Sequence, residues 1–175
     1  MSKIVWDLDG VLRDFGTIYH ERFKIPQSND WNFKYKDKGV YDWVKEDYSI
    51  LVDADPTPYF SVIKDWLGGN EIEIWSHQPE DWIPYTRKWL DNHLKDQYKV
   101  HYLTPKEKYA KLNDSKDTFL VDDYPFFEDY KKIILIDYDY NKDSKSVIRI
   151  KDKHQLRFLL GESVENCSFS NEDAK

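Results

Sequence analysis

The chain has 175 residues and a net charge of −7 at pH 7, with 40% hydrophobic and 34% charged residues. This length suits a single domain with a small insertion, and no apolar run approaches the ~18 residues that a membrane-spanning helix needs. Lysine and arginine residues are scattered rather than clustered, which argues against a stable nucleic-acid partner. The sequence opens on a strand pattern without a signal-peptide core and has one cysteine, Cys167, so we expect a cytoplasmic protein without a disulfide framework.

The first predicted element is a buried strand, residues 3–8, that runs into two carboxylates. Asp7 and Asp9 belong to residues 7–12 (DLDGVL), and Gly10 lets the backbone turn sharply. Ligands of open α/β sheets bind beyond the carboxyl ends of the strands, and strand residues two apart can face the same way. One carboxylate to attack and a second to move a proton suit phosphoryl transfer. A surface turn is the alternative for this motif.

The next segment, residues 14–57, is long, aromatic and without an obvious buried strand. We interpret it as a small, mostly helical cap beside the first motif, with an irregular packing extension as the alternative. Its rings can stack on a planar substrate or simply hold the cap together. They are Phe15, Tyr19, Trp31, Phe33, Tyr35, Tyr41, Trp43 and Tyr48. The candidates for substrate contact are Arg13, Phe15, Tyr19, Trp31 and Trp43.

Strands and helices alternate through the rest of the chain. We expect strands at 71–75, 99–103, 118–122 and 133–137 with an edge strand at 147–150, and helices at 58–67, 80–95, 105–112 and 153–160. This alternation predicts an α/β fold with a parallel sheet and crossover helices. The core then comprises residues 1–13 and 58–160, and we expect the polar tail 161–175 to be disordered.

Two further polar positions follow later strands. Ser76 ends the second strand, where a hydroxyl can donate to a phosphate oxygen beside the N-terminus of the next helix, although a helix N-cap is the alternative. Lys106 comes early in the helix 105–112, where an ammonium can hold a phosphate. Lys108 and Lys111 are rivals in the same segment, and a solvated surface lysine is the alternative for each.

An apolar strand that ends in paired carboxylates is the fourth feature. Residues 119–125 (FLVDDYP) contain Asp122 and Asp123 directly after the apolar run. Mg²⁺ prefers oxygen ligands, usually one or two carboxylates with water and substrate oxygens. Asp7, the backbone carbonyl of Asp9, and Asp122 or Asp123 would supply them, while a helix cap or turn is the alternative.

The order of these features across residues 3–137 resembles the haloacid-dehalogenase-like (HAD) phosphatase superfamily. The resemblance implies a Rossmann-like sheet, Mg²⁺ dependence, a cap inserted after the first motif and an aspartyl-phosphate intermediate. It assigns Asp7 as the nucleophile and Asp9 as the general acid and base. The implied phosphate-binding residues are Ser76 and Lys106, with Lys108 as rival, and the implied metal site comprises Asp7, Asp9, Asp122 and Asp123.

Within the superfamily, residues 7–15 (DLDGVLRDF) and the short aromatic cap look most like the 5′(3′)-deoxyribonucleotidase group. Residues 75–82 (WSHQPEDW) suit small nucleotidase-like members, including phage-encoded ones. Arg13 departs from the small residue expected there, and a cation would change the charge at the pocket mouth. The resemblance thus implies a phosphatase for a small phosphorylated substrate, foremost a nucleoside monophosphate. The alternatives are another phosphometabolite, a phosphoprotein, a nucleic-acid end, or a non-catalytic binding protein on this fold.

Overall fold

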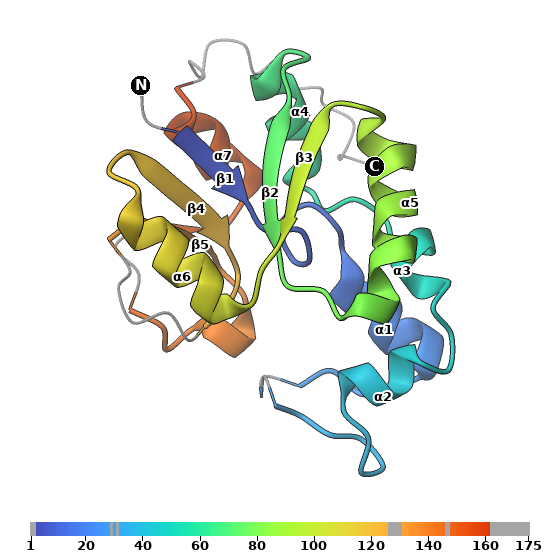
Figure 1. Ribbon diagram of the computed structural model, residues 1–175. Helices are drawn as coiled ribbons and strands as arrows, with labels where there is room; N and C mark the ends of the chain where they lie inside the picture. The colour runs from blue at the N-terminus through green and yellow to red at the C-terminus, as the bar shows by residue number, and fades with distance from the viewer. Residues whose placement is uncertain (1–2, 29, 31, 126–130, 146–147, 162–175) are drawn as a thin grey trace, which may run out of the picture.

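The computed structural model describes residues 3–28, 30, 32–125, 131–145 and 148–161. Its centre is a six-stranded sheet in the order β3-β2-β1-β4-β5-β6, in which all neighbouring strands run parallel (Figure 1). The strands are β1 (Lys3–Trp6), β2 (Ile72–Ser76), β3 (Tyr98–Tyr102), β4 (Thr118–Asp122), β5 (Ile133–Ile136) and β6 (Ile148–Ile150). The expected α/β architecture with a parallel sheet is therefore confirmed.

Helices connect the strands and flank the sheet. They are α1 (Phe15–Phe23), α2 (Val40–Val44), α3 (Ile50–Asp53), α4 (Phe60–Leu67), α5 (Ile83–Leu94), α6 (Pro105–Asp114) and α7 (Lys153–Leu159), with short 3₁₀ turns η1 (Glu80–Trp82) and η2 (Asp139–Asn141). The four helices expected outside the insertion are present, and α6 begins with a reciprocal cap. Thr104 Oγ1 accepts from the Glu107 N–H over 3.3 Å, and the Glu107 carboxylate accepts from the Thr104 N–H over 2.7 Å.

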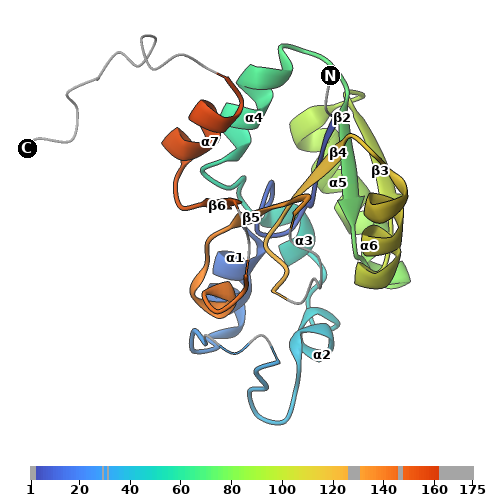
Figure 2. The same cartoon turned by 90° about the vertical axis from the view of Figure 1, so that its left-hand side faces the viewer.

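Alternate side chains of the central strand β1 enter two different cores. Trp6 packs with side chains of α4, α5 and α7 on one face of the sheet. Val5 packs on the other face with Leu112 of α6. Figure 2 shows α4 and α7 on one side of the sheet and α6 on the other. Because both faces of the central strands are covered, their sequences are continuous apolar runs rather than alternating ones.

The insertion between β1 and β2, residues 14–57, contains α1, α2 and α3 joined by turns and irregular backbone. The Asp14 carboxylate caps α1 by accepting from the Thr17 N–H over 3.2 Å. Buried side chains of the insertion form a separate cluster with Trp82 of η1: Tyr19, Ile25, Trp43, Val44, Ile50 and Leu51. The insertion therefore has a small core of its own, and α3 lies against α5 (Figure 1).

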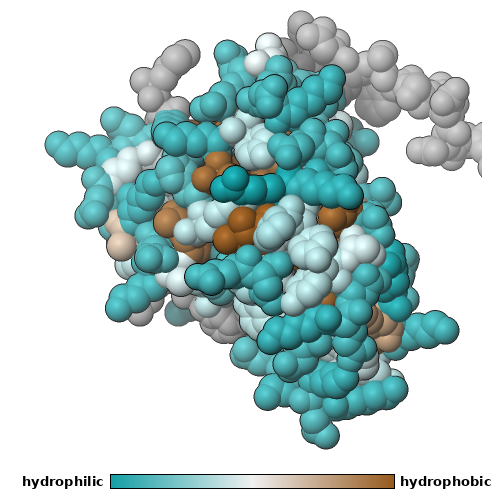
Figure 3. Space-filling view, turned by 45° about the vertical axis from the view of Figure 1, so that its right-hand side comes forward, coloured by the Kyte–Doolittle hydropathy of each residue, from teal (hydrophilic) through white to brown (hydrophobic). Residues whose placement is uncertain are grey.

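The face of the molecule that carries α5 is mostly polar. Figure 3, a view toward the side that carries α5, shows mainly hydrophilic residues with scattered hydrophobic patches between them. Across the described ranges, no helix has both the length and the apolar character that crossing a membrane requires. The tail expected at 161–175 lies outside the described residues, apart from Gly161.

Candidate active site

Three carboxylates meet at the carboxyl edge of the sheet, where β1 and β4 end side by side. Asp7 follows β1, and its backbone N–H donates to Val121 O of β4 over 2.8 Å. Asp122 ends β4 and Asp123 follows it. The three carboxylates each place one oxygen within 4.8 Å of the others, and all three residues are buried. The structure thus brings together three of the acidic residues that the sequence analysis assigned to one site.

The turn after β1 is built around Gly10 and the carbonyl of Leu8. Leu8 O accepts from the N–H of Arg13 over 2.8 Å, which folds the chain back on itself. Gly10 has φ +78°, and a Cβ there would lie 2.2 Å from Asp123 Oδ2. The Tyr138 hydroxyl donates to Gly10 O over 2.8 Å. Glycine is required here both by its backbone conformation and by the closeness of Asp123.

Lys108 is the lysine that reaches the carboxylates. Its Nζ donates to Asp7 Oδ1 over 2.6 Å and to Asp122 Oδ2 over 2.9 Å, and the residue is 3% exposed. Lys106 is exposed. The helical period explains the difference, because Lys108 lies four residues before the buried Leu112 and shares its face of α6. Of the lysines left open by the sequence, Lys108 is the one that contacts Asp7 and Asp122.

The cluster carries more negative than positive formal charge. Three carboxylates surround one ammonium, an excess of two negative charges if all are ionised. Burial is the main cause that raises the pKa of Asp7 to about 7; Lys108 opposes this shift and Asp122 adds to it. Burial likewise raises the pKa of Asp123 well above its ordinary range. Burial disfavours the charge of Lys108, but the carboxylates of Asp122 and Asp7 outweigh it and raise the pKa of Lys108.

Residues after β5 hold the loop that carries Asp123. The Tyr140 hydroxyl donates to the Asp123 carboxylate. Asn141 Nδ2 donates to Asp123 O over 2.9 Å and to Ile136 O over 2.8 Å. The rings of Tyr138 and Tyr140 stack with their centroids 5.2 Å apart. These contacts fix the Asp123 carboxylate against the turn after β1.

Asp9 is held by a different pair of residues. Arg13 Nε and Nη2 donate to its two carboxylate oxygens over 2.6 and 3.0 Å. Gln78 Nε2 donates to Asp9 Oδ2 over 2.7 Å and to Ser76 Oγ over 3.0 Å, so Ser76 is connected to Asp9 through Gln78. We expected Arg13 at the mouth of the substrate pocket, but it is 0% exposed and pairs with Asp9.

The candidate aromatic residues of the insertion occupy different environments. Tyr19 and Trp43 are buried in the core of the insertion, where their rings serve packing. Phe15 is partly buried and lies against Tyr19, with ring centroids 5.7 Å apart. Trp31 lies outside the described residues.

One ring of the insertion, that of Tyr41, is exposed. Tyr41 of α2 is 45% exposed, and its ring centroid is 5.3 Å from that of Trp82, which in turn lies 5.6 Å from Phe15. Partial burial raises the pKa of the Tyr41 hydroxyl, and the neighbouring Tyr124 and Asp9 add to the shift. Tyr41 is therefore within electrostatic reach of Asp9, while its ring remains accessible.

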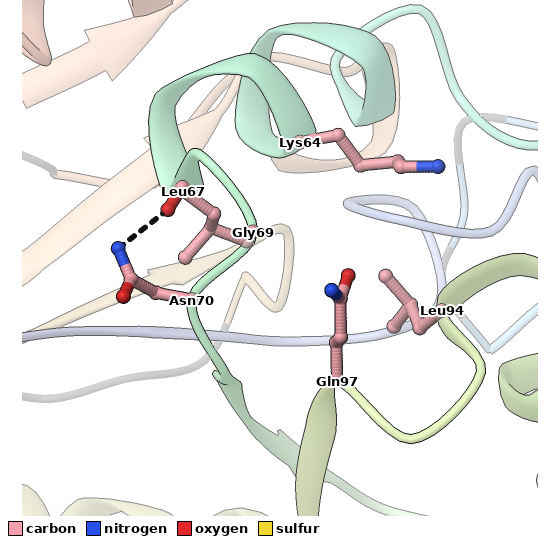
Figure 4. Close-up of a pocket in the computed structure, with 6 residues that line it drawn as sticks. All are labelled: Lys64, Leu67, Gly69, Asn70, Leu94 and Gln97. Carbon is pink, nitrogen blue, oxygen red and sulfur yellow. Dashed lines mark hydrogen bonds between the residues drawn. The ribbon is translucent and has the colours of Figure 1, made fainter.

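A small pocket of about 200 Å³ lies at the opposite edge of the sheet, near the beginning of β2 and β3. Figure 4 shows its lining side chains: Lys64, Leu67, Gly69, Asn70, Leu94 and Gln97. The Asn70 amide donates to Leu67 O over 2.7 Å, so part of the polar lining is already paired. None of the residues that the sequence analysis assigned to a site lines this pocket.

No protein-family model and no curated protein matches the sequence. The assignment of the site to a reaction therefore depends on the sequence motifs and on the geometry described above.

Several site residues had not been singled out from the sequence. They are Gln78 and Thr86 around Asp9, and Tyr138, Tyr140 and Asn141 around the loop of Asp123. One signal was available: Arg13 follows Asp9 by four residues, a spacing at which opposite charges commonly pair when the chain curls. The other contacts join residues far apart in sequence, and no local sequence pattern predicts them.

Proposed function

We propose that this protein is a Mg²⁺-dependent phosphomonoester hydrolase of the HAD type that works through an aspartyl-phosphate intermediate. The observation that carries the proposal is the buried Lys108 ammonium, which bridges Asp7 and Asp122 while Asp123 lies against them. Buried charges are costly, so a fold keeps such a cluster where it serves a ligand or a reaction. Asp9 completes the set, two residues after the proposed nucleophile.

A divalent cation fits the carboxylate cluster in charge and in chemistry. Two excess negative charges and carboxylate oxygens are what Mg²⁺ requires. Asp122 already accepts from Lys108 at one oxygen and from the Tyr124 N–H at the other, over 2.9 Å each. Asp7, Asp122 and Asp123 would hold the ion, with the backbone carbonyl of Asp9 as a further ligand. The bound ion would supply positive charge that offsets the repulsion between a phosphate dianion and a carboxylate.

The chain's own residues then account for two displacements. The Asp7 carboxylate attacks phosphorus, and the bond to the leaving oxygen breaks as Asp9 gives that oxygen a proton. Asp9 next takes a proton from the water that attacks the acyl phosphate, which frees inorganic phosphate and restores Asp7. Lys108 neutralises charge on the phosphate during both steps, and residues 14–57 act as the cap that limits access of water.

A nucleoside monophosphate is the substrate class that the surroundings favour most. Tyr41 offers an accessible ring on the insertion, backed by Trp82 and Phe15. Stacking a base on such a ring is worth about 1–3 kcal/mol, which is enough to prefer a nucleotide over a sugar phosphate by about tenfold or more.

A panel assay tests the proposal. Phosphate release is measured with Mg²⁺ from deoxynucleoside and nucleoside 5′- and 3′-monophosphates, sugar phosphates and a phosphoserine peptide, and again with EDTA in excess. We expect Mg²⁺-dependent release, fastest from nucleotides. Equal rates with EDTA would reject the metal dependence. Release from no substrate in the panel would reject the phosphatase assignment.

A further inference from the structure

We propose that Arg13 and Gln78 are positioning residues for Asp9 and that they link its carboxylate to the insertion. The inference rests on the proposed function, because it concerns the residue to which that function assigns proton transfer. Arg13 had been expected to face substrate, and Gln78 had no expected role. The structure gives both residues a place behind the proposed acid and base.

The contact between Arg13 and Asp9 is a two-pronged one. Nε and Nη2 of the guanidinium donate to the two oxygens of the same carboxylate. Such a pair fixes the rotation of the carboxylate as well as its place, which a single-point ammonium contact does not. Gln78 Nε2 adds a donor to Asp9 Oδ2 over 2.7 Å. Both carboxylate oxygens are therefore held by named donors.

The rest of the guanidinium is anchored in two other elements. Arg13 Nη1 donates to Leu51 O of α3 over 2.8 Å and to Thr86 Oγ1 of α5 over 3.3 Å. The Thr86 hydroxyl in turn donates to Gln78 Oε1 over 3.0 Å. A shift of α3 would therefore be transmitted to Asp9 through one rigid side chain.

Arg13 and Asp9 differ in their exposure to solvent. The Arg13 side chain is 0% exposed, whereas the Asp9 side chain is 24% exposed. The donors of Arg13 thus belong to a fully buried side chain, and part of the Asp9 side chain remains open to solvent. An arginine that served only to fill the core would pair with any buried acceptor. This one is aimed at the carboxylate that follows the proposed nucleophile by two residues.

The test compares two aryl phosphates with the full-length protein and Mg²⁺. Phenyl phosphate needs a proton on its leaving oxygen much more than p-nitrophenyl phosphate does, so its turnover reports the placement of Asp9. The variants are Arg13→Lys, which keeps the charge and loses the fork, and Gln78→Leu, which removes the amide donor. Arg22→Lys is the matched control, because Arg22 pairs with Asp47 and Asp53 inside the insertion over 2.6 and 3.1 Å. The variant Asp9→Asn and the double variant Asp9→Asn with Gln78→Leu complete a double-mutant cycle.

We expect both variants to lose about tenfold to a hundredfold more kcat with phenyl phosphate than with p-nitrophenyl phosphate, and Arg22→Lys to affect both substrates alike. In the Asp9→Asn background, Gln78→Leu should have little further effect. If Arg13→Lys does not fold, the double-mutant cycle of Gln78 and Asp9 tests the positioning role by itself. Equal losses of kcat on both substrates would overturn the positioning role alone. The same loss of kcat from Gln78→Leu in the wild-type and Asp9→Asn backgrounds would do so as well. If the wild-type protein turns over neither aryl phosphate, the proposed function is overturned together with this inference.

Discussion

Asp7 and Asp9 belong to one loop, yet the two sides of the site hold them in different ways. Asp7 is deeply buried and pairs with an ammonium on a flexible stem, shared with Asp122. Asp9 is partly exposed and pairs with a guanidinium fork whose other nitrogen is tied to α3 and α5. A point charge suits a carboxylate whose bonding changes during a reaction, and a fork suits one that must keep its orientation. The two carboxylates thus have different surroundings, and the roles proposed for them can be tested separately.

The largest effect in this comparison should come from removing the nucleophile. Asp7→Asn is nearly isosteric but cannot form the acyl phosphate, so we expect turnover to fall to the background level with the fold retained. Phosphate release and circular dichroism measure the two properties. A folded Asp7→Asn protein with near wild-type turnover would assign the attack to another group.

The next largest effect concerns the lysine side of the site, with Lys106 as the matched control. Lys108→Met leaves two buried carboxylates without their partner, which costs about 3–5 kcal/mol of stability, and it removes the cation proposed to neutralise the phosphate. Lys106→Met, two residues away on the exposed side of α6, should change stability by no more than about 0.5 kcal/mol. Urea denaturation and phosphate release compare the two. Similar stabilities and rates for both variants would contradict the assignment of Lys108.

The raised pKa of Asp7 predicts a pH-dependent stability of the metal-free protein. The folded state binds this proton more tightly than the unfolded state, whose ordinary value is 3.8. The contribution of Asp7 to stability is therefore fully present below about pH 4 and is lost as the pH rises through about 7. Asp7→Asn lacks this loss. As the pH rises from 4 to 8 in EDTA, its melting temperature should therefore increase relative to that of the wild type.

Mg²⁺ sharpens the same experiment, because the ion competes with protons for the cluster. A ligand at a hundred times its dissociation constant stabilises by about 2.7 kcal/mol. The rise in wild-type melting temperature on adding Mg²⁺ should thus be greater at pH 8 than at pH 5, and smaller in Asp7→Asn. An unchanged rise across this pH range would place Mg²⁺ elsewhere.

The smallest effect concerns the insertion. Tyr41→Ala removes the accessible ring of the insertion and should raise KM for a nucleoside monophosphate by about fivefold or more, by loss of stacking. The hydrolysis of a sugar phosphate should change little. Trp43→Ala is the contrasting variant, because Trp43 is buried in the core of the insertion and its loss should lower stability instead. If Tyr41→Ala keeps the nucleotide-to-sugar-phosphate preference of the wild type, the ring does not select substrate.

The sequence was sufficient for the sheet, because β1, β4 and β5 are short, mostly buried apolar runs and helical segments separate the strands. It was also sufficient to place Asp7, Asp122 and Asp123 together, since parallel strands end at one edge. The choice of the lysine required knowledge of which face of α6 is buried. Leu112 lies on that face, and counting residues from a motif does not identify it.

Arg13 illustrates why the remainder was out of reach. A charged residue after a turn is ordinarily solvated, and its burial depends on the acceptors Leu51 O and Thr86 Oγ1, which come from two distant elements. The same holds for Tyr140, whose contact with Asp123 bridges β4 and the segment after β5. Such pairings are properties of the assembled tertiary structure.

The central claim is that Asp7 is transiently phosphorylated. The most direct measurement is rapid acid quenching of the protein during turnover of a ³²P-labelled nucleoside monophosphate with Mg²⁺, followed by mapping of the labelled peptide. The account predicts label on Asp7 that hydroxylamine releases, and none in Asp7→Asn. Steady phosphate release with no label on Asp7 under the same quench, or equal labelling of Asp7→Asn, would contradict it.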